Sequence, residues 1–193
     1  MRTLTINERL EKIKDKILED KFIDGRGLGN EISFYIFDYD PKYELLVRDH
    51  VKMLKRIFGR EYYNRKLIEI DLYKLLLDLG KKQRVYELFF EKEKKEGKDE
   101  LFKALSNFAN PEIFLDEIER RIQGYNVVLI TGVGKVYPFV RSHTILNRLQ
   151  EKVDKIPVIM FYPGEYDGQS LKLFGTFKDD NYYRAFQLVD HKA

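Results

Sequence analysis

Two aspartates, Asp38 and Asp40, follow a short apolar run at residues 32–37 and are separated by one tyrosine. Carboxylates in this position can work as a phosphatase pair, in which one attacks phosphorus and the other manages the proton and a magnesium ion. Asp40 also precedes Pro41, and this dipeptide is typical of a helix start, where the aspartate accepts backbone N–H bonds. The capping interpretation is therefore favoured, and a phosphatase would need Asp38, Asp40, Lys135 and Asp180 to converge.

A second candidate is the glycine-containing run at residues 130–135, which follows an apolar stretch. Glycines and a lysine after a buried strand can hold an anion. The spacing does not match a Walker A motif, because Leu129 stands where the first glycine belongs and Val136 stands where a hydroxyl residue belongs. A tight turn with Lys135 in solvent is favoured over an anion site formed by Thr131, Gly132, Gly134 and Lys135.

Arg141 and His143 follow this run after a short loop that contains Pro138. His143 could act as a general base, but the sequence places no nucleophile or orienting carboxylate beside it, and Ser142 lacks the surroundings of a hydrolase nucleophile. We expect Arg141 and His143 to be held in a fixed orientation at one edge of the sheet. Arg141 then either lines an exposed docking or anion-binding surface, or is a buried partner of Asp38 or another carboxylate.

Tyrosines flank Pro163-Gly164, a dipeptide that is typical of a turn. We expect the rings beside it to be exposed and to form part of a contact surface. The residues of this candidate surface are Tyr162, Glu165 and Tyr166.

Basic residues gather in the stretch from Lys52 to Lys66, where two tyrosines could stack on bases. Cations also gather at helix ends for electrostatic reasons, so the structural interpretation is favoured. The candidate nucleic-acid contacts are Lys55, Arg56, Arg60, Tyr62, Tyr63 and Arg65.

The elements that must position these residues alternate between strands and helices. Apolar periodicity predicts helices over residues 6–22, after Pro41 to about Gly59, and around 145–153, and it predicts strands at 32–37, 67–70, 127–131 and 158–162. Shorter runs follow at 171–177 and 182–189. The pattern predicts a single α/β domain over residues 1–193, with a mainly parallel sheet flanked by helices in a Rossmann-like three-layer sandwich. A helical lobe at about residues 72–123 interrupts it.

Composition limits the chemistry further. The 193-residue chain has no Cys and three scattered His, so thiol chemistry is excluded and neither a metal nor another cofactor is expected. The net charge of +3 is spread along the chain, which has no basic arm. The N-terminal residues carry charges every few positions, so no membrane association is expected, and the predicted location is the cytoplasm.

Several segments together resemble the BrxB family of the bacterial BREX phage-exclusion systems. The most specific is the run from Thr131 to His143, and the similarity extends over essentially the whole chain, although the lobe at 72–123 carries little of it. The other segments lie at residues 27–30, 34–41, 46–48, 161–168, 173–175 and 181–186.

The resemblance implies membership of a multi-protein defence system that includes a DNA methyltransferase and the PglZ protein. Proteins of this family have no established catalytic activity and are associated with PglZ. The leading hypothesis is therefore a non-enzymatic adaptor that docks PglZ, with other BREX subunits as further partners and any nucleic-acid contact indirect. A phosphate- or nucleotide-handling enzyme and a DNA-contacting subunit stay open as alternatives, as does a homodimer.

Overall fold

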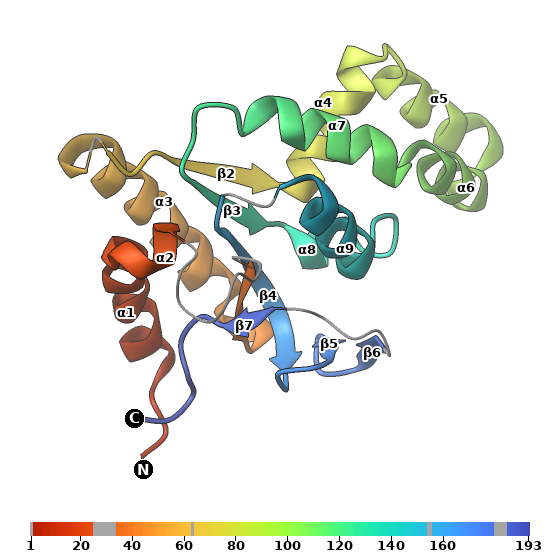
Figure 1. Ribbon diagram of the computed structural model, residues 1–193. Coiled ribbons are helices and arrows are strands. Elements are labelled where there is room, and N and C mark those ends of the chain that lie inside the picture. Colours follow the sequence, from red (N-terminus) through yellow and green to blue (C-terminus); the bar gives the residue numbers. More distant parts are fainter. Residues whose placement is uncertain (1, 25–33, 63, 154–155, 180–184) are drawn as a thin grey trace.

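The computed structural model of the protein describes residues 2–24, 34–62, 64–153, 156–179 and 185–193. Its centre is a sheet with the strand order β2-β3-β4-β1-β7 (Figure 1). These strands are β1 (Phe34–Tyr39), β2 (Leu67–Asp71), β3 (Val127–Thr131), β4 (Val158–Tyr166) and β7 (Phe186–Gln187). The fold is α/β with a mostly parallel sheet, as the sequence predicts.

The parallel pairing brings the carboxyl ends of the strands to one edge of the sheet. Strand β1 pairs with β4 from Phe34↔Val158 to Tyr39↔Pro163, and β2 pairs with β3 from Leu67↔Val127 to Asp71↔Thr131. A small antiparallel hairpin of β5 (Leu171–Leu173) and β6 (Phe177–Asp179) extends from the end of β4. Side chains at the ends of β1 to β4 therefore lie at the edge where open parallel sheets usually bind ligands.

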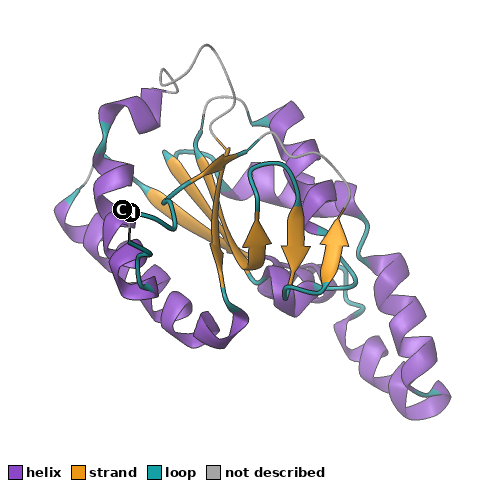
Figure 2. Ribbon diagram, turned by 90° about the horizontal axis from the view of Figure 1, so that it is seen from below, coloured by secondary structure: helices purple, strands orange, loops and turns teal. Residues whose placement is uncertain are grey.

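Helices cover both faces of the sheet, which Figure 2 shows as strands between two helical layers. One face packs against α1 (Ile6–Leu18), α2 (Asp20–Asp24) and α3 (Glu44–Glu61), which follows a short 3-10 turn, η1 (Pro41–Tyr43). The other face packs against α4 (Leu72–Lys82), α7 (Pro111–Arg121), α8 (Val133–Val136) and α9 (Ser142–Lys152). Alternate residues of each strand enter opposite cores, so Val128 and Ile130 pack on one face and Val127 and Leu129 on the other.

The first helix differs from its prediction in one respect. The apolar stripe over residues 6–22 predicts one helix, whereas the structure has two, separated at Glu19, whose backbone is extended. The first begins with a capping box, in which the Thr5 side chain accepts from the Glu8 N–H and the Glu8 carboxylate accepts from the Thr5 N–H. Glu19 pairs with Lys16 and with Lys21, one on each side of the break.

The elements between β2 and β3 are all helices, and these helices have two different roles. Helices α4 and α7 belong to the layer that covers the sheet. Helices α5 (Tyr86–Glu96) and α6 (Lys98–Phe108) contain no buried residue. They pack on each other, with the Phe89 and Phe108 ring centroids 5.3 Å apart. The pair projects from the rest of the molecule (Figures 1 and 2), and we call it the α5–α6 hairpin.

The two ends of the chain lie together (Figure 1). Thr3 forms an antiparallel bridge with Lys192, and the Leu4 N–H donates to the His191 carbonyl at 2.8 Å. The C-terminal residues are thereby held beside the start of α1. Within the part of the chain that the structure describes, no helix is both long enough and apolar enough to span a membrane.

Candidate functional site

Asp38 lies near the carboxyl end of β1, an interior strand of the sheet, and is almost completely buried, with 3% of its surface exposed. Arg9 of α1 is equally buried and reaches it with both terminal nitrogens. Its Nη2 donates to Asp38 Oδ1 at 2.8 Å, and its Nη1 donates to the Asp38 backbone carbonyl at 2.7 Å. A buried ion pair is stable only when further hydrogen bonds satisfy it, so the surroundings of Asp38 matter.

Three further groups surround the Asp38 carboxylate. The Tyr166 N–H of β4 donates to Oδ2 at 3.2 Å, and Gln187 Nε2 of β7 donates to Oδ1 at 2.6 Å. His191 Nε2 lies 2.9 Å from both carboxylate oxygens. We call Arg9, Asp38, Gln187 and His191 the β1 cluster. It joins α1, β1, β4, β7 and the C-terminal residues, so the Asp38 oxygens hold the fold together and are not free to attack a substrate.

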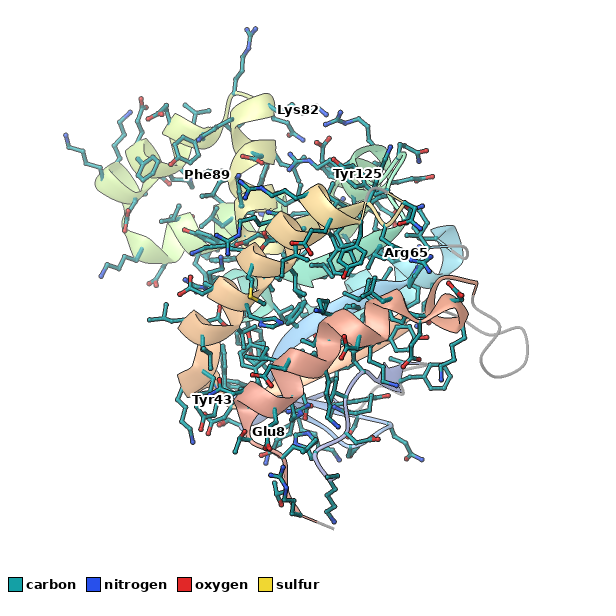
Figure 3. The ribbon with its side chains drawn as sticks, turned by 90° about the vertical axis from the view of Figure 1, so that its left-hand side faces the viewer. Glu8, Tyr43, Arg65, Lys82, Phe89 and Tyr125 are labelled. Carbon is teal, nitrogen blue, oxygen red and sulfur yellow. The ribbon has the colours of Figure 1, made fainter. Side chains whose placement is uncertain are left out.

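Asp40 is the helix cap that its position before Pro41 predicts. Its carboxylate accepts from the Lys42 N–H at 3.0 Å and pairs with the Lys42 ammonium at 2.8 Å. The hydrogen bond from the Lys42 side chain is the main cause that lowers the pKa of Asp40. Asp40 and Asp38 both line a cavity of about 760 Å³ between the starts of α1 and α3, the region marked by Glu8 and Tyr43 in Figure 3.

The run at residues 130–135 forms a tight turn, as predicted, but Lys135 is partly buried and paired with Asp71. Gly132 has a left-handed backbone with φ of 74°, and a Cβ there would lie 2.3 Å from Asp71 Oδ1. The Lys135 ammonium donates to the Asp71 carboxylate, which also caps α4 through the Tyr73 N–H. Thr131 is buried and its hydroxyl donates to Glu69 at 2.8 Å. The side chains of Thr131 and Lys135 therefore bind carboxylates of β2. This arrangement supports neither Lys135 free in solvent nor Lys135 in an anion site.

The three described residues of the phosphatase hypothesis are each held by a different partner. Asp38 is held by Arg9, Asp40 by Lys42 and Lys135 by Asp71, and Asp180 lies outside the described residues. No group of three or more acidic or histidine side chains in the described ranges has a geometry that could hold a metal ion. The geometry gives this hypothesis no support.

The prediction of exposed tyrosines around Pro163-Gly164 is wrong. Strand β4 continues through both residues to Tyr166, so the dipeptide is not a turn. Tyr162 is 1% exposed and Tyr166 is 7% exposed, because both rings enter the core below α8 and α9. A Cβ on Gly164 would lie 2.2 Å from the Lys172 carbonyl, so the glycine is required for close pairing with β5. Glu165 alone among the three surface candidates is exposed.

Arg141 and His143 lie at the start of α9, where Arg141 is the N-cap residue. Arg141 is exposed and lines a cavity of about 370 Å³, whereas His143 is half-buried. The alternative in which Arg141 is the buried partner of Asp38 is wrong, because Arg9 occupies that position. Arg141 is thus a surface residue beside a cavity.

Part of the basic stretch from Lys52 to Lys66 is paired with carboxylates of the protein. Lys52 pairs with Asp49 and Lys55 with Glu69, each at 2.8 Å. The Tyr62 ring packs on Phe58 with centroids 5.1 Å apart, so it is not a free stacking surface. Arg65, labelled in Figure 3, pairs with Asp20 at 2.8 Å, Arg56 and Arg60 are exposed, and Tyr63 lies outside the described residues.

Two buried charges were missed at the sequence level. Arg9 stands inside the apolar stripe of α1, directly before Leu10, and a charge in that position was a signal that a buried partner exists. Glu117 of α7 is 4% exposed and accepts hydrogen bonds from Lys82, Arg120 and Arg121. The bond from Arg120 is the main cause that holds the pKa of Glu117 far below its ordinary value. This cluster fixes α4, which ends at the labelled Lys82 in Figure 3, against α7.

These features define the class of the protein: a three-layer α/β sandwich whose polar strand ends are paired internally and whose helical hairpin is exposed. The chain belongs to the BrxB family, because the family model described as BREX protein BrxB matches residues 68–188. That match includes the α5–α6 hairpin.

Two relatives support the assignment. A protein named BREX protein BrxB from Bacillus cereus (strain H3081.97) is 47% identical over 189 residues, which cover 96% of this chain and 98% of that protein. A second protein of that name, from Escherichia coli O9:H4 (strain HS), is 35% identical over 183 residues, covering 94% of this chain and 90% of that protein. No solved structure matches the chain.

Proposed function

We propose that the protein is a non-enzymatic adaptor of a bacterial BREX phage-defence complex that binds the PglZ component. In this role it supports host DNA methylation and phage restriction in the cytoplasm. Membership of the BrxB family supports the BREX context. The chain acts as one unit, residues 1–193, with the α5–α6 hairpin as its docking element.

The observation that carries the proposal is the unburied apolar surface of this hairpin. Leu88 and Phe90 are each 54% exposed, and Phe102 is 49% exposed although its ring packs on Phe139 with centroids 5.4 Å apart. Phe90 also lines a cavity of about 180 Å³ together with Leu77 and Leu105. Exposed apolar surface with an adjoining apolar hollow is typical of a protein-binding site.

The internal pairing of the polar strand ends supports the non-enzymatic part of the proposal. An acid, a base or a nucleophile must be able to reach a substrate. Asp38 and Lys135, the best-placed candidates at the carboxyl edge, are hydrogen-bonded to Arg9 and Asp71.

Co-expression with PglZ followed by size-exclusion chromatography tests the proposal. We expect one peak that contains both proteins at micromolar concentration, and two separate peaks for the double variant Leu88→Ser/Phe90→Ser. Leu45→Ser is the matched control, because Leu45 is 71% exposed but lies on α3. Separate peaks for the unchanged protein would overturn PglZ binding, and co-elution of the double variant would overturn the role of the hairpin.

A further inference from the structure

The cavity beside Arg141 lies at the carboxyl edge of β3 and β4, between the start of α9 and the β5–β6 hairpin. Its volume of about 370 Å³ is within the range of small-molecule sites, roughly 300–1,000 Å³. Two cationic residues line it, Arg141 and Lys178, and none of the described residues that line it is an Asp or a Glu. The remaining polar lining comes from Tyr137, Ser142, Tyr162 and Thr176. This lining favours an anionic ligand.

Arg141 is the cation with the freedom to bind such a ligand. It is exposed, and no ion pair joins it to any residue in the described ranges, whereas Arg148 on the same helix pairs with Glu112 at 3.3 Å. A guanidinium can form two parallel hydrogen bonds to a phosphate group. Arg141 therefore supplies a charge at the cavity that the folded protein itself does not use.

The start of α9 adds to the attraction. This 11-residue helix has no acidic residue in its first turn, and no side chain caps its first N–H groups. Uncapped N–H groups and the helix dipole both favour negative charge at this position. Together with Arg141 they make one side of the cavity suited to a phosphate group.

Another part of the cavity lining is aromatic. The rings of Tyr137 and Phe177 lie 5.2 Å apart at an interplanar angle of 35°, and Phe177 is 49% exposed. An exposed aromatic ring offers a flat surface on which a nucleobase can stack. The cavity thus offers a cationic group, Arg141, and an aromatic ring, Phe177, to one ligand. Its volume is small for a ligand site, which favours a small molecule.

We propose that this cavity binds a nucleoside 5′-monophosphate, with its phosphate at Arg141 and the start of α9 and its base on Phe177. The ligand is bound and not converted. No described residue of the α5–α6 hairpin lines this cavity, so the inference does not rest on PglZ binding.

Isothermal titration calorimetry of the full chain at low salt tests the proposal, with AMP, GMP, CMP and UMP as probes. We expect binding of at least one nucleotide, and a weaker response to adenosine, which lacks the phosphate. Arg141→Ala should weaken binding about 10-fold or more. Arg148→Ala is the matched control and should leave the affinity unchanged.

The ring contact has its own variant. Phe177→Ala should weaken nucleotide binding about 10-fold while leaving the weak binding of inorganic phosphate unchanged. Thermal melts must show that each variant is folded, which we expect because both residues are exposed. Failure of all four nucleotides to bind at millimolar concentration would overturn the proposal, and so would equal binding by adenosine and AMP or by the Arg141→Ala variant.

A last arm distinguishes a free nucleotide from the end of a nucleic-acid strand. A short single-stranded DNA with a 5′-phosphate is compared with the same strand without it and with AMP. We expect AMP to compete with the phosphorylated strand for one site. Tight binding of both strands regardless of the terminal phosphate would contradict a site that recognises a phosphate at Arg141.

Discussion

The carboxyl edge of the sheet and the α5–α6 hairpin contrast in how they use their side chains. At the edge, two polar side chains are buried and paired: Asp38 is 3% exposed and bonded to Arg9, and Thr131 is 7% exposed and bonded to Glu69. On the hairpin, the apolar side chains of Leu88 and Phe90 are each 54% exposed. Each region thus reverses the usual distribution of polar and apolar groups.

The contrast separates residues that hold the fold from residues that are free to meet another molecule. A buried ion pair with several hydrogen bonds is a structural element, even at an edge where ligands usually bind. Exposed apolar surface stabilises the folded chain little, because its contact with water hardly changes on folding. We therefore expect variants of these buried pairs to reduce stability and hairpin variants to reduce binding.

The largest expected effect is that of Arg9→Met, which leaves Asp38 buried without its cation. Loss of one partner of a buried pair costs about 3–5 kcal/mol, so the free energy of unfolding in urea should fall by that amount. Arg2→Met is the control, because the Arg2–Glu8 pair is exposed and should contribute little to stability. Equal stability of the two variants would contradict a structural role for the β1 cluster.

Glu117→Gln should have the next largest effect, about 1–3 kcal/mol, because a buried acceptor of three cationic donors loses its charge. The pKa of Glu117 is lowered in the folded state, mainly by its bond from Arg120. This contribution is present above the unfolded pKa near 4.5 and is lost as the pH falls, so the difference between protein and variant should shrink in acid. Urea titrations at pH 7 and pH 3 measure it, with the exposed Glu112→Gln as control.

His50 should give a smaller effect of pH. Burial between α1 and α3 lowers its pKa below 6.5, and its Nε2 is buried without a hydrogen-bond partner. The unfolded chain therefore takes up the proton more readily, so stability is fully present above pH 6.5 and is lost as the pH falls below it. Between pH 7.5 and 5.5 the free energy of unfolding should fall less for His50→Met than for the unchanged protein. An equal fall in the two proteins would refute this.

Arg141→Ala should have the smallest effect on stability, less than about 0.5 kcal/mol, because the side chain is exposed. The same variant should abolish phage defence in cells if the cavity is needed there. Thermal melting and phage plating on one variant separate the two effects. A stable variant with full defence would show that the cavity has no part in defence.

The arrangement of helices and strands could be predicted from the sequence because apolar periodicity sets both. The strand at Val127–Thr131 has the predicted bounds, and Asp40 is the predicted cap. The partners of Asp38 could not be predicted, since Gln187 and His191 lie about 150 positions away and no local pattern links them. Tyr162 and Tyr166 were misplaced because Pro163-Gly164 was assigned to a turn, whereas the strand continues through it to meet β5.

The most direct test of the hairpin as the docking element is to measure the dissociation constant of the complex with PglZ. Purified chain, the Leu88→Ser/Phe90→Ser variant and the Leu45→Ser control should be compared by biolayer interferometry with immobilised PglZ. The account predicts micromolar or tighter binding for the chain and the control, and a loss of 100-fold or more for the double variant, the size expected when hot-spot side chains of an interface are removed. Equal affinity for all three, with all three folded, would contradict it.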